Sequence, residues 1–267
     1  MPESAAAHRP RHASATPARL EALAVEAASE GAEVIRAAAG QLGIIGTKST
    51  PTDPVTALDV AVEQTIRDRL ERSTPGAGFL GEEEGSHAGD SAVGWILDPI
   101  DGTVNLTYGI PIICVSLAAT IDGRVVAGAV IDPWRAEVFS AARGMGARIG
   151  GTPITTSAVD RLASALVATG FAYASEGRRA QVEAVGRVLP AARDVRCFGS
   201  SAIHLCWVAN GRLDAFYQRG MQRWDYAAGA LIAEEAGARV EHPTPANDQL
   251  MVAASPRVFD ALVALLG

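Results

Sequence analysis

The order of the predicted strands and helices constrains the fold of this chain more than any other feature. Between residues 113 and 142, three apolar segments, ICVSLAATI, RVVAGAVIDP and EVFSAA, follow one another with only short turns between them. Asp122-Gly123, between the first two, is typical of a two-residue β-hairpin turn. From about residue 160, short apolar strands alternate with helical segments. A strand-rich sheet followed by α/β alternation predicts two layered systems rather than one doubly wound sheet.

Two helices are predicted before the first sheet. Apolar and small residues recur at helical spacing from Leu20 to Ala38, and Gly40 follows as a stop signal. A second helix begins near Thr56, which has the spacing of a capping box with Asp59. We therefore divide the chain into three parts. Residues 1–18 are rich in Ala, Arg, Pro and Ser and are expected to form a disordered tail. Residues 19–157 form an N-terminal α+β half, and residues 158–267 form a C-terminal α/β half.

Charge and composition exclude several classes of protein. The formal net charge of −7 argues against a general nucleic-acid binder, which would need a basic surface. The three cysteines have no C-x-x-C spacing, so we expect reduced core residues in a cytoplasmic protein. The longest apolar stretch, Ile110 to Ile121, is interrupted by polar residues and proline and is too short to span a bilayer. We expect neither nucleic acid nor membrane as a partner.

The segment DPIDGT, residues 98–103, is the strongest chemical signal. Asp98 ends an apolar run, and Asp101 follows in a turn shaped by Pro99 and Gly102. If residues 102–107 open a helix, its first N–H groups point at the same place as the two carboxylates, which suits a phosphate beside a metal ion. The alternative is a simple strand-to-helix turn in which both aspartates cap N–H groups.

Other acidic residues fit the same chemistry less specifically. Glu82, in GEEEG, would meet Asp98 if their strands are neighbours, and such hard oxygen ligands suit Mg²⁺. A solvated acidic loop is the alternative, and for Glu84 we prefer it. Asp225 opens a predicted helix, where a plain N-cap explains it equally well. The capping-box spacing explains Asp59 simply as the start of a helix. Lys48, just upstream, could balance a carboxylate cluster or an anion, and the alternative is a solvated surface lysine.

Taken together, the segments GEE, DPIDGTVN and WDYAAG, in this order and spacing, resemble the inositol monophosphatase family of bacterial type. KSTPTDPVTALD upstream and GSSAIHL between the later motifs strengthen the resemblance. It implies a five-layer αβαβα sandwich and Mg²⁺-dependent hydrolysis of a phosphomonoester, with two or three Mg²⁺ ions per active site. It also implies sensitivity to lithium and a homodimer.

The resemblance assigns roles to individual residues. Glu82, Asp98 and the carbonyl group of Ile100 would hold one Mg²⁺, while Asp98 would bridge to a second held by Asp101 and Asp225. Asp59 and the Thr103 hydroxyl would orient the attacking water. Lys48 and Glu83 would support these ligands from behind. The phosphate and the organic part of the substrate would be bound by Gly102, Thr103, Gly199, Ser200, Ser201 and Ala202.

The assigned residues are consistent in charge. Four carboxylates bring about four negative charges, which two Mg²⁺ ions would neutralise. The metals would act as Lewis acids and lower the pKa of the attacking water.

One departure from the family pattern concerns the substrate. Relatives that cleave inositol phosphates commonly carry a glutamate where this chain has Gln218, and a charge-assisted hydrogen bond is roughly twice as strong as a neutral one. Arg219 and Arg223 follow Gln218 closely in the sequence. We expect one of them to bind a second anionic group of the substrate, and Arg223 is the first candidate.

Several functions remain open. Inositol 1-phosphate is the first expected substrate, with histidinol phosphate and fructose 1,6-bisphosphate or NADP as alternatives. Phosphoadenosine compounds fit less well, because their enzymes typically carry D-P-L-D-G-T-K, whereas this chain has Ile100 and Val104. An alternative of a different class is a non-catalytic, metal-binding regulatory protein.

Overall fold

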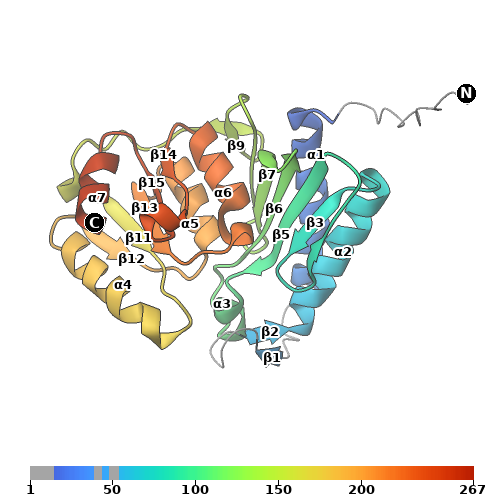
Figure 1. The fold of residues 1–267 in the computed structure, drawn as a ribbon, viewed down its shortest axis with the longest axis horizontal. Coiled ribbons are helices and arrows are strands. Elements are labelled where there is room, and N and C mark those ends of the chain that lie inside the picture. Colours follow the sequence, from blue (N-terminus) through green and yellow to red (C-terminus); the bar gives the residue numbers. More distant parts are fainter. Residues whose placement is uncertain (1–14, 39–43, 48–53) are drawn as a thin grey trace, which may run out of the picture.

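The protein is built from five alternating layers of helices and sheets (Figure 1). The computed structural model describes residues 15–38, 44–47 and 54–267. One outer layer consists of helices α1 (Pro17–Ala37) and α2 (Ala57–Ser73). The middle layer consists of α5 (Ser201–Ala209) and α6 (Arg223–Glu235). The other outer layer consists of α4 (Ser175–Val188) and α7 (Phe259–Leu266). An eight-stranded and a five-stranded sheet lie between these pairs. The predicted αβαβα sandwich is confirmed.

The first sheet has the strand order β10-β9-β8-β7-β6-β5-β3-β4. Its strands, from β3 to β10, are Gly78–Gly81, Gly85–His87, Val93–Asp101, Cys114–Ile121, Arg124–Asp132, Glu137–Ala142, Ala147–Ile149 and Thr152–Ile154. The predicted hairpin β6–β7 is confirmed, and Asp122 and Gly123 have the positive φ angles of 50° and 78° that such a turn requires. The pair β3–β5 is parallel, so both strands end at the same edge of the sheet.

The second sheet has the order β12-β11-β13-β15-β14. Its strands, from β11 to β15, are Leu166–Thr169, Asp194–Arg196, Ala215–Arg219, Arg239–Glu241 and Leu250–Ala254. Strand β12 ends at Arg196, so residues 197–199 form a loop, and Gly199 has a φ of 82°. Short elements complete the chain: strands β1 (Ile44–Thr47) and β2 (Pro54–Thr56), helix α3 (Thr103–Thr107) and two 3₁₀ turns, Leu162–Ser164 and Pro245–Asn247.

Helix α1 confirms the helical spacing seen in the sequence, although Gly40 lies outside the described residues. Its buried face packs on β7 and on α2. A side chain at Gly31 would place its Cβ 2.7 Å from Cδ1 of Ile66 on α2. The glycine at residue 31 therefore leaves room for the Ile66 side chain where the two helices pack together.

The middle helix layer positions the chemistry of the protein. Helix α5 is apolar on all sides because both of its faces are covered by sheets. Burial on both sides fixes α5 and α6, and their N-terminal ends lie beside the end of β5. None of the described helices is long and apolar enough to cross a membrane.

Candidate active site

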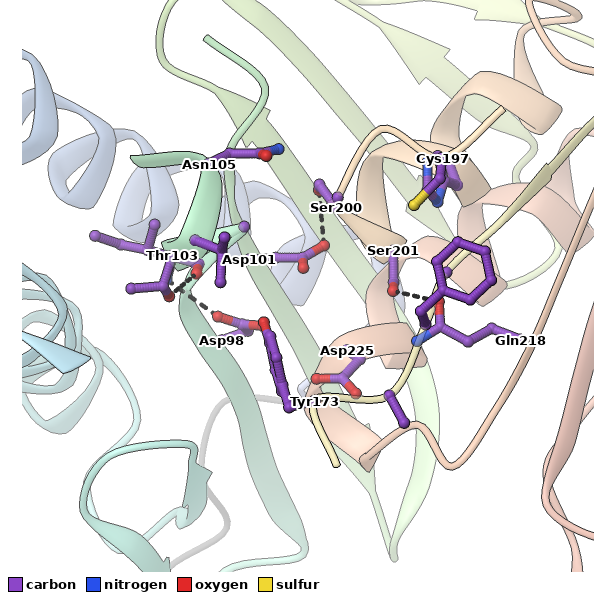
Figure 2. A pocket seen from close by; sticks show the side chains of 18 of the residues that line it. Asp98, Asp101, Thr103, Asn105, Tyr173, Cys197, Ser200, Ser201, Gln218 and Asp225 are labelled. Atoms are coloured by element: carbon purple, nitrogen blue, oxygen red, sulfur yellow. Dashed lines mark hydrogen bonds between the residues drawn. The ribbon is translucent and has the colours of Figure 1, made fainter. Parts of the chain in front are cut away.

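A cleft of about 540 Å³ opens where the end of β5 meets the first turns of α5 and α6 (Figure 2). The cleft is lined from both halves of the chain. Every predicted metal ligand lines it, and so do most of the predicted substrate-binding residues: Glu82, Asp98, Ile100, Asp101, Asp225, Gly102, Thr103, Gly199, Ser200, Ser201 and Gln218. Sequence segments more than a hundred residues apart therefore meet here.

The irregular end of β5 carries both aspartates, and a local hydrogen bond holds Asp98. The ladder between β5 and β6 is irregular between Asp98 and Asp101, which frees the chain to turn. The Ile100 N–H donates to Oδ1 of Asp98 at 3.1 Å. Gly102 has a φ of 104°, and a Cβ there would lie 2.9 Å from the Ile112 carbonyl oxygen. Only glycine fits this position, which turns the chain into α3 as predicted.

Asp59 and Thr103 form a buried pair behind the cleft. The Thr103 hydroxyl lies 3.1 Å from Oδ1 of Asp59 and 3.0 Å from the Ile100 carbonyl oxygen. The other oxygen of Asp59 accepts from the Thr56 N–H at 2.8 Å, which confirms the predicted capping box. Asp59 thus starts α2 and also holds the Thr103 hydroxyl at the cleft wall.

Glu82 reaches the cleft from the turn after β3. Because β3 and β5 run parallel, with Gly81 paired to Leu97, Glu82 and Asp98 follow neighbouring strand ends, as predicted. The Glu82 N–H continues this ladder by donating to the Leu97 carbonyl at 3.2 Å. Glu84 is exposed and forms an ion pair with Arg67, which agrees with its interpretation as a solvated residue.

Asp225 enters from α6, and its place in the helix differs from a simple N-cap. Gln222 is the N-cap, and Asp225 is the third helical residue. Oδ2 of Asp225 accepts from the Gln222 N–H at 2.7 Å. The carboxylate therefore fixes the helix start while it faces the cleft.

Asp101 connects the two halves of the chain. Its Oδ2 accepts from the Ser200 hydroxyl at 2.8 Å and from the Ala202 N–H at 2.6 Å, at the start of α5. Burial raises the pKa of Asp101 to about 7; the charge of Glu82 adds to the rise, and the bonds from Ala202 and Ser200 oppose it. The negative charge gathered in this cleft is thus incompletely balanced by the protein itself.

The chemistry of these residues fits a divalent cation. Four carboxylates, one from the turn after β3, two from the end of β5 and one from α6, face one cleft, and oxygen ligands of this kind are those that Mg²⁺ prefers. Within the described part of the chain, no three acidic, histidine or cysteine side chains are gathered tightly enough to form a metal site by themselves. A cation bound between these like charges would offset their mutual repulsion.

The opposite wall of the cleft is polar and built by hydrogen bonds. The Ser201 hydroxyl donates to Oε1 of Gln218 at 3.1 Å (Figure 2). Asn105, from α3, donates to the carbonyl groups of Phe198 at 2.6 Å and Ile112 at 2.8 Å, and so joins the two halves. Asn105 is the last residue of the DPIDGTVN segment, but nothing in the sequence indicates this role.

Other cleft residues were not found from the sequence. They include Tyr108, Phe171, Tyr173, Arg178, Cys197 and His204. Arg178 donates to the carbonyl groups of Ala172 and Tyr173 at 2.9 and 3.1 Å and so holds the loop after β11. Cys114 and Cys206 are core residues as predicted, but Cys197 is exposed, because the strand before it ends early.

Some predicted residues are not brought into the cleft. Arg223 is absent from the cleft lining and donates to the Gly123 carbonyl at 2.7 Å, so the expectation that it faces the substrate is not met. Arg219 is directed to the carbonyl groups of Asn247 and Leu266. Glu83 and Ala202 are not among the residues that line the cleft, and Lys48 lies outside the described residues.

Comparison with known proteins agrees with this geometry. Residues 17–265 match the inositol monophosphatase family. The chain is 46% identical to the inositol-1-monophosphatase SuhB of Mycobacterium tuberculosis, over 94% of each chain. The solved structure of Mycobacterium tuberculosis SuhB, 44% identical, superposes with a TM-score of 0.83 and covers 95% of this chain and 97% of its own. A protein of Escherichia coli named Nus factor SuhB is 38% identical, over 79% of this chain and 82% of its own.

The match spans nearly the whole chain and includes every segment that builds the cleft. The chain belongs to the inositol monophosphatase family, a family of phosphoric monoester hydrolases.

Proposed function

We propose that this chain is a Mg²⁺-dependent phosphomonoesterase that hydrolyses a small phosphorylated metabolite, with inositol 1-phosphate as the first expected substrate. The observation that carries the proposal is the meeting of Glu82, Asp98, Asp101 and Asp225 in one cleft beside the Asp59–Thr103 pair. The name of the Mycobacterium tuberculosis relative supports the choice of substrate.

The carboxylates and the Ile100 carbonyl would hold two or three Mg²⁺ ions. When bound, Mg²⁺ supplies a Lewis acid for the phosphoryl oxygens and lowers the pKa of a water molecule. The protein's own contribution is position and charge, which is what phosphoryl transfer requires. Gly102 and Thr103 line the cleft at the start of α3, and their main-chain N–H groups would bind the phosphate.

Thr103 and Asp59 orient the attacking water. With its proton directed to Asp59, the Thr103 oxygen presents a lone pair to the cleft. A water that donates to this oxygen is held with its own oxygen directed at phosphorus. Its proton can pass to Thr103 as the Thr103 proton moves to the Asp59 carboxylate.

The organic part of the substrate would lie against Gly199, Ser200, Ser201 and Gln218. The amide of Gln218 can bond sugar hydroxyls, so inositol is accepted, but without the charge of a carboxylate. Histidinol phosphate, fructose 1,6-bisphosphate and NADP are the competing substrates. The proposal also includes a cytoplasmic homodimer and inhibition by lithium, both from the family.

Phosphate release from these four compounds, with and without Mg²⁺, tests the proposal. We expect release that depends on Mg²⁺ and is fastest with inositol 1-phosphate. If another compound releases phosphate fastest, the proposed reaction would stand and that compound would replace inositol 1-phosphate as the proposed substrate. Mg²⁺ binding without release from any compound would favour the alternative, a non-catalytic regulatory protein. The Escherichia coli relative is named a Nus factor, and this name is the reason for keeping the alternative.

A further inference from the structure

The carboxylate of Glu63 lies beneath the turn that carries Glu82. Glu63 is on α2, one helical turn after Asp59, and both side chains are completely buried. Residues four apart lie on the same face of a helix. Helix α2 therefore directs two buried carboxylates to the same side: Asp59 to Thr103 after β5, and Glu63 to the turn after β3.

Glu63 uses one oxygen for each of two consecutive N–H groups. Its Oε2 accepts from the Glu83 N–H at 3.0 Å, and its Oε1 accepts from the Glu84 N–H at 3.0 Å. The N–H group before these, that of Glu82, donates to the Leu97 carbonyl. Three successive main-chain donors of the turn are thus bound to buried acceptors, and the backbone of Glu82 is fixed from both sides.

The surroundings of Glu63 disfavour the charged form of its carboxylate. Burial raises the pKa of Glu63, and the charges of Glu84 and Glu82 raise it further, against the two backbone bonds that lower it. The fit also depends on Gly81, because a Cβ there would lie 2.3 Å from Oε1 of Glu63. Burying a carboxylate among like charges costs free energy unless hydrogen bonds compensate for the lost water. The bonds to the Glu82 turn are the ones it makes.

We propose that Glu63 is a positioning residue for metal binding, which holds the Glu82–Glu84 turn so that the Glu82 side chain faces Asp98 and Asp101. The inference rests on the proposed Mg²⁺-dependent function. Glu63 touches neither metal nor substrate and acts through Glu82. Groups that bond the ligands of a metal from outside fix the orientation of those ligands and tune the affinity.

Mn²⁺ binding, measured by electron paramagnetic resonance without substrate, tests this role. The change Glu63→Gln keeps the size of the side chain but turns one acceptor into an N–H donor that faces another N–H group. We expect Mn²⁺ binding to weaken by about 10- to 100-fold. Glu71→Gln is the matched control: Glu71 is on the same helix, its side chain is 68% exposed, and it pairs only with Arg67 among the described residues. We expect no change in this control.

The pair of variants Glu82→Gln and Glu63→Gln/Glu82→Gln separates positioning from a general structural role. If Glu63 acts through Glu82, the change at residue 63 adds less than about a twofold loss once Glu82 is altered. An equal loss of Mn²⁺ affinity in both backgrounds would overturn the inference. So would a folded Glu63→Gln variant that binds Mn²⁺ as tightly as the wild type.

A second variant covers the case in which Glu63→Gln does not fold. Glu63→Asp keeps the charge and shortens the side chain by one methylene, so it loses reach rather than acidity. We expect the same weaker binding and the same dependence on Glu82; wild-type affinity would contradict the role. A wild-type chain that neither binds Mn²⁺ nor releases phosphate would overturn the proposed function and this inference together. An active wild type with an unaffected Glu63→Gln overturns only the inference.

Discussion

Asp101 accepts the Ala202 N–H at 2.6 Å, across the boundary between the two sheets. The same carboxylate oxygen accepts the Ser200 hydroxyl, which is also the N-cap of α5. A residue of the first half therefore completes the helix start of the second half. A movement of α5 would therefore displace Asp101, so the carboxylates and the polar wall of the cleft are expected to move together.

We expect Asp98→Asn to abolish turnover. Asp98 is 3% exposed, and its Oδ1 bonds the Ile100 N–H, so the amide can keep the turn while it removes a charge from the cluster. Loss of one group that stabilises charge in a transition state costs at least about 10²-fold in kcat. Initial rates at saturating Mg²⁺ check this. Glu84→Gln, which alters an exposed acid nearby, is the control, and near-normal activity of Asp98→Asn would rule out its place in the metal site.

Removal of the Thr103 hydroxyl should lower kcat more than it changes KM. The hydroxyl bonds Asp59, and in the proposed mechanism it orients the attacking water and does not bind the organic part of the substrate. Proton transfer of this kind contributes about 10²- to 10⁴-fold to the rate. Steady-state kinetics of Thr103→Ala, with Thr103→Ser as the variant that restores the hydroxyl, measures the effect. If both variants behave alike, the hydroxyl has no part in the chemistry.

The sequence was informative where local pattern and chemistry coincide. The apolar strand that carries Asp98, the turn at Gly102 and the capping box of Thr56 and Asp59 are each specified by neighbouring residues. The turn and the capping box are confirmed, whereas the strand continues past Asp98 and ends at Asp101. Arg223 was misplaced because the direction of a long side chain depends on a distant carbonyl, that of Gly123, which the sequence does not connect to it.

Glu63 and Asn105 were overlooked for the same reason. Their partners are main-chain groups 20 and 93 residues away, and main-chain groups carry no sequence signal. The αβαβα layers followed from the family resemblance, whereas the element pattern alone predicted only two layered systems.

Gln218→Glu should increase the preference for inositol 1-phosphate. Oε1 of Gln218 accepts from Ser201, and a glutamate would keep this bond while it presents a charged acceptor to sugar hydroxyls. A charge-assisted bond exceeds a neutral one by about 1 kcal/mol, or about fivefold in kcat/KM. The ratio of kcat/KM for inositol 1-phosphate to that for fructose 1,6-bisphosphate measures the change. An unaltered ratio would place hydroxyl recognition elsewhere in the cleft.

The buried His204 should make the protein less stable in mild acid. His204 is 1% exposed; its Nε2 accepts from the Phe198 N–H at 3.1 Å, so its proton is on Nδ1, for which the described residues offer no acceptor. Burial lowers the pKa of His204 to about 3 from 6.5. Between these values the unfolded chain binds a proton that the folded chain does not, so stability falls as the pH falls below 6.5.

The loss amounts to about 1.4 kcal/mol per pH unit below 6.5, or about 2 kcal/mol between pH 7 and pH 5. In His204→Asn the amide oxygen can still accept the Phe198 N–H, but the titrating group is gone. Urea unfolding at both pH values should therefore show a smaller difference in free energy for this variant than for the wild type. His87→Asn, which removes an exposed histidine, should keep the wild-type difference. An identical difference in His204→Asn and the wild type would mean that His204 is protonated in the folded protein.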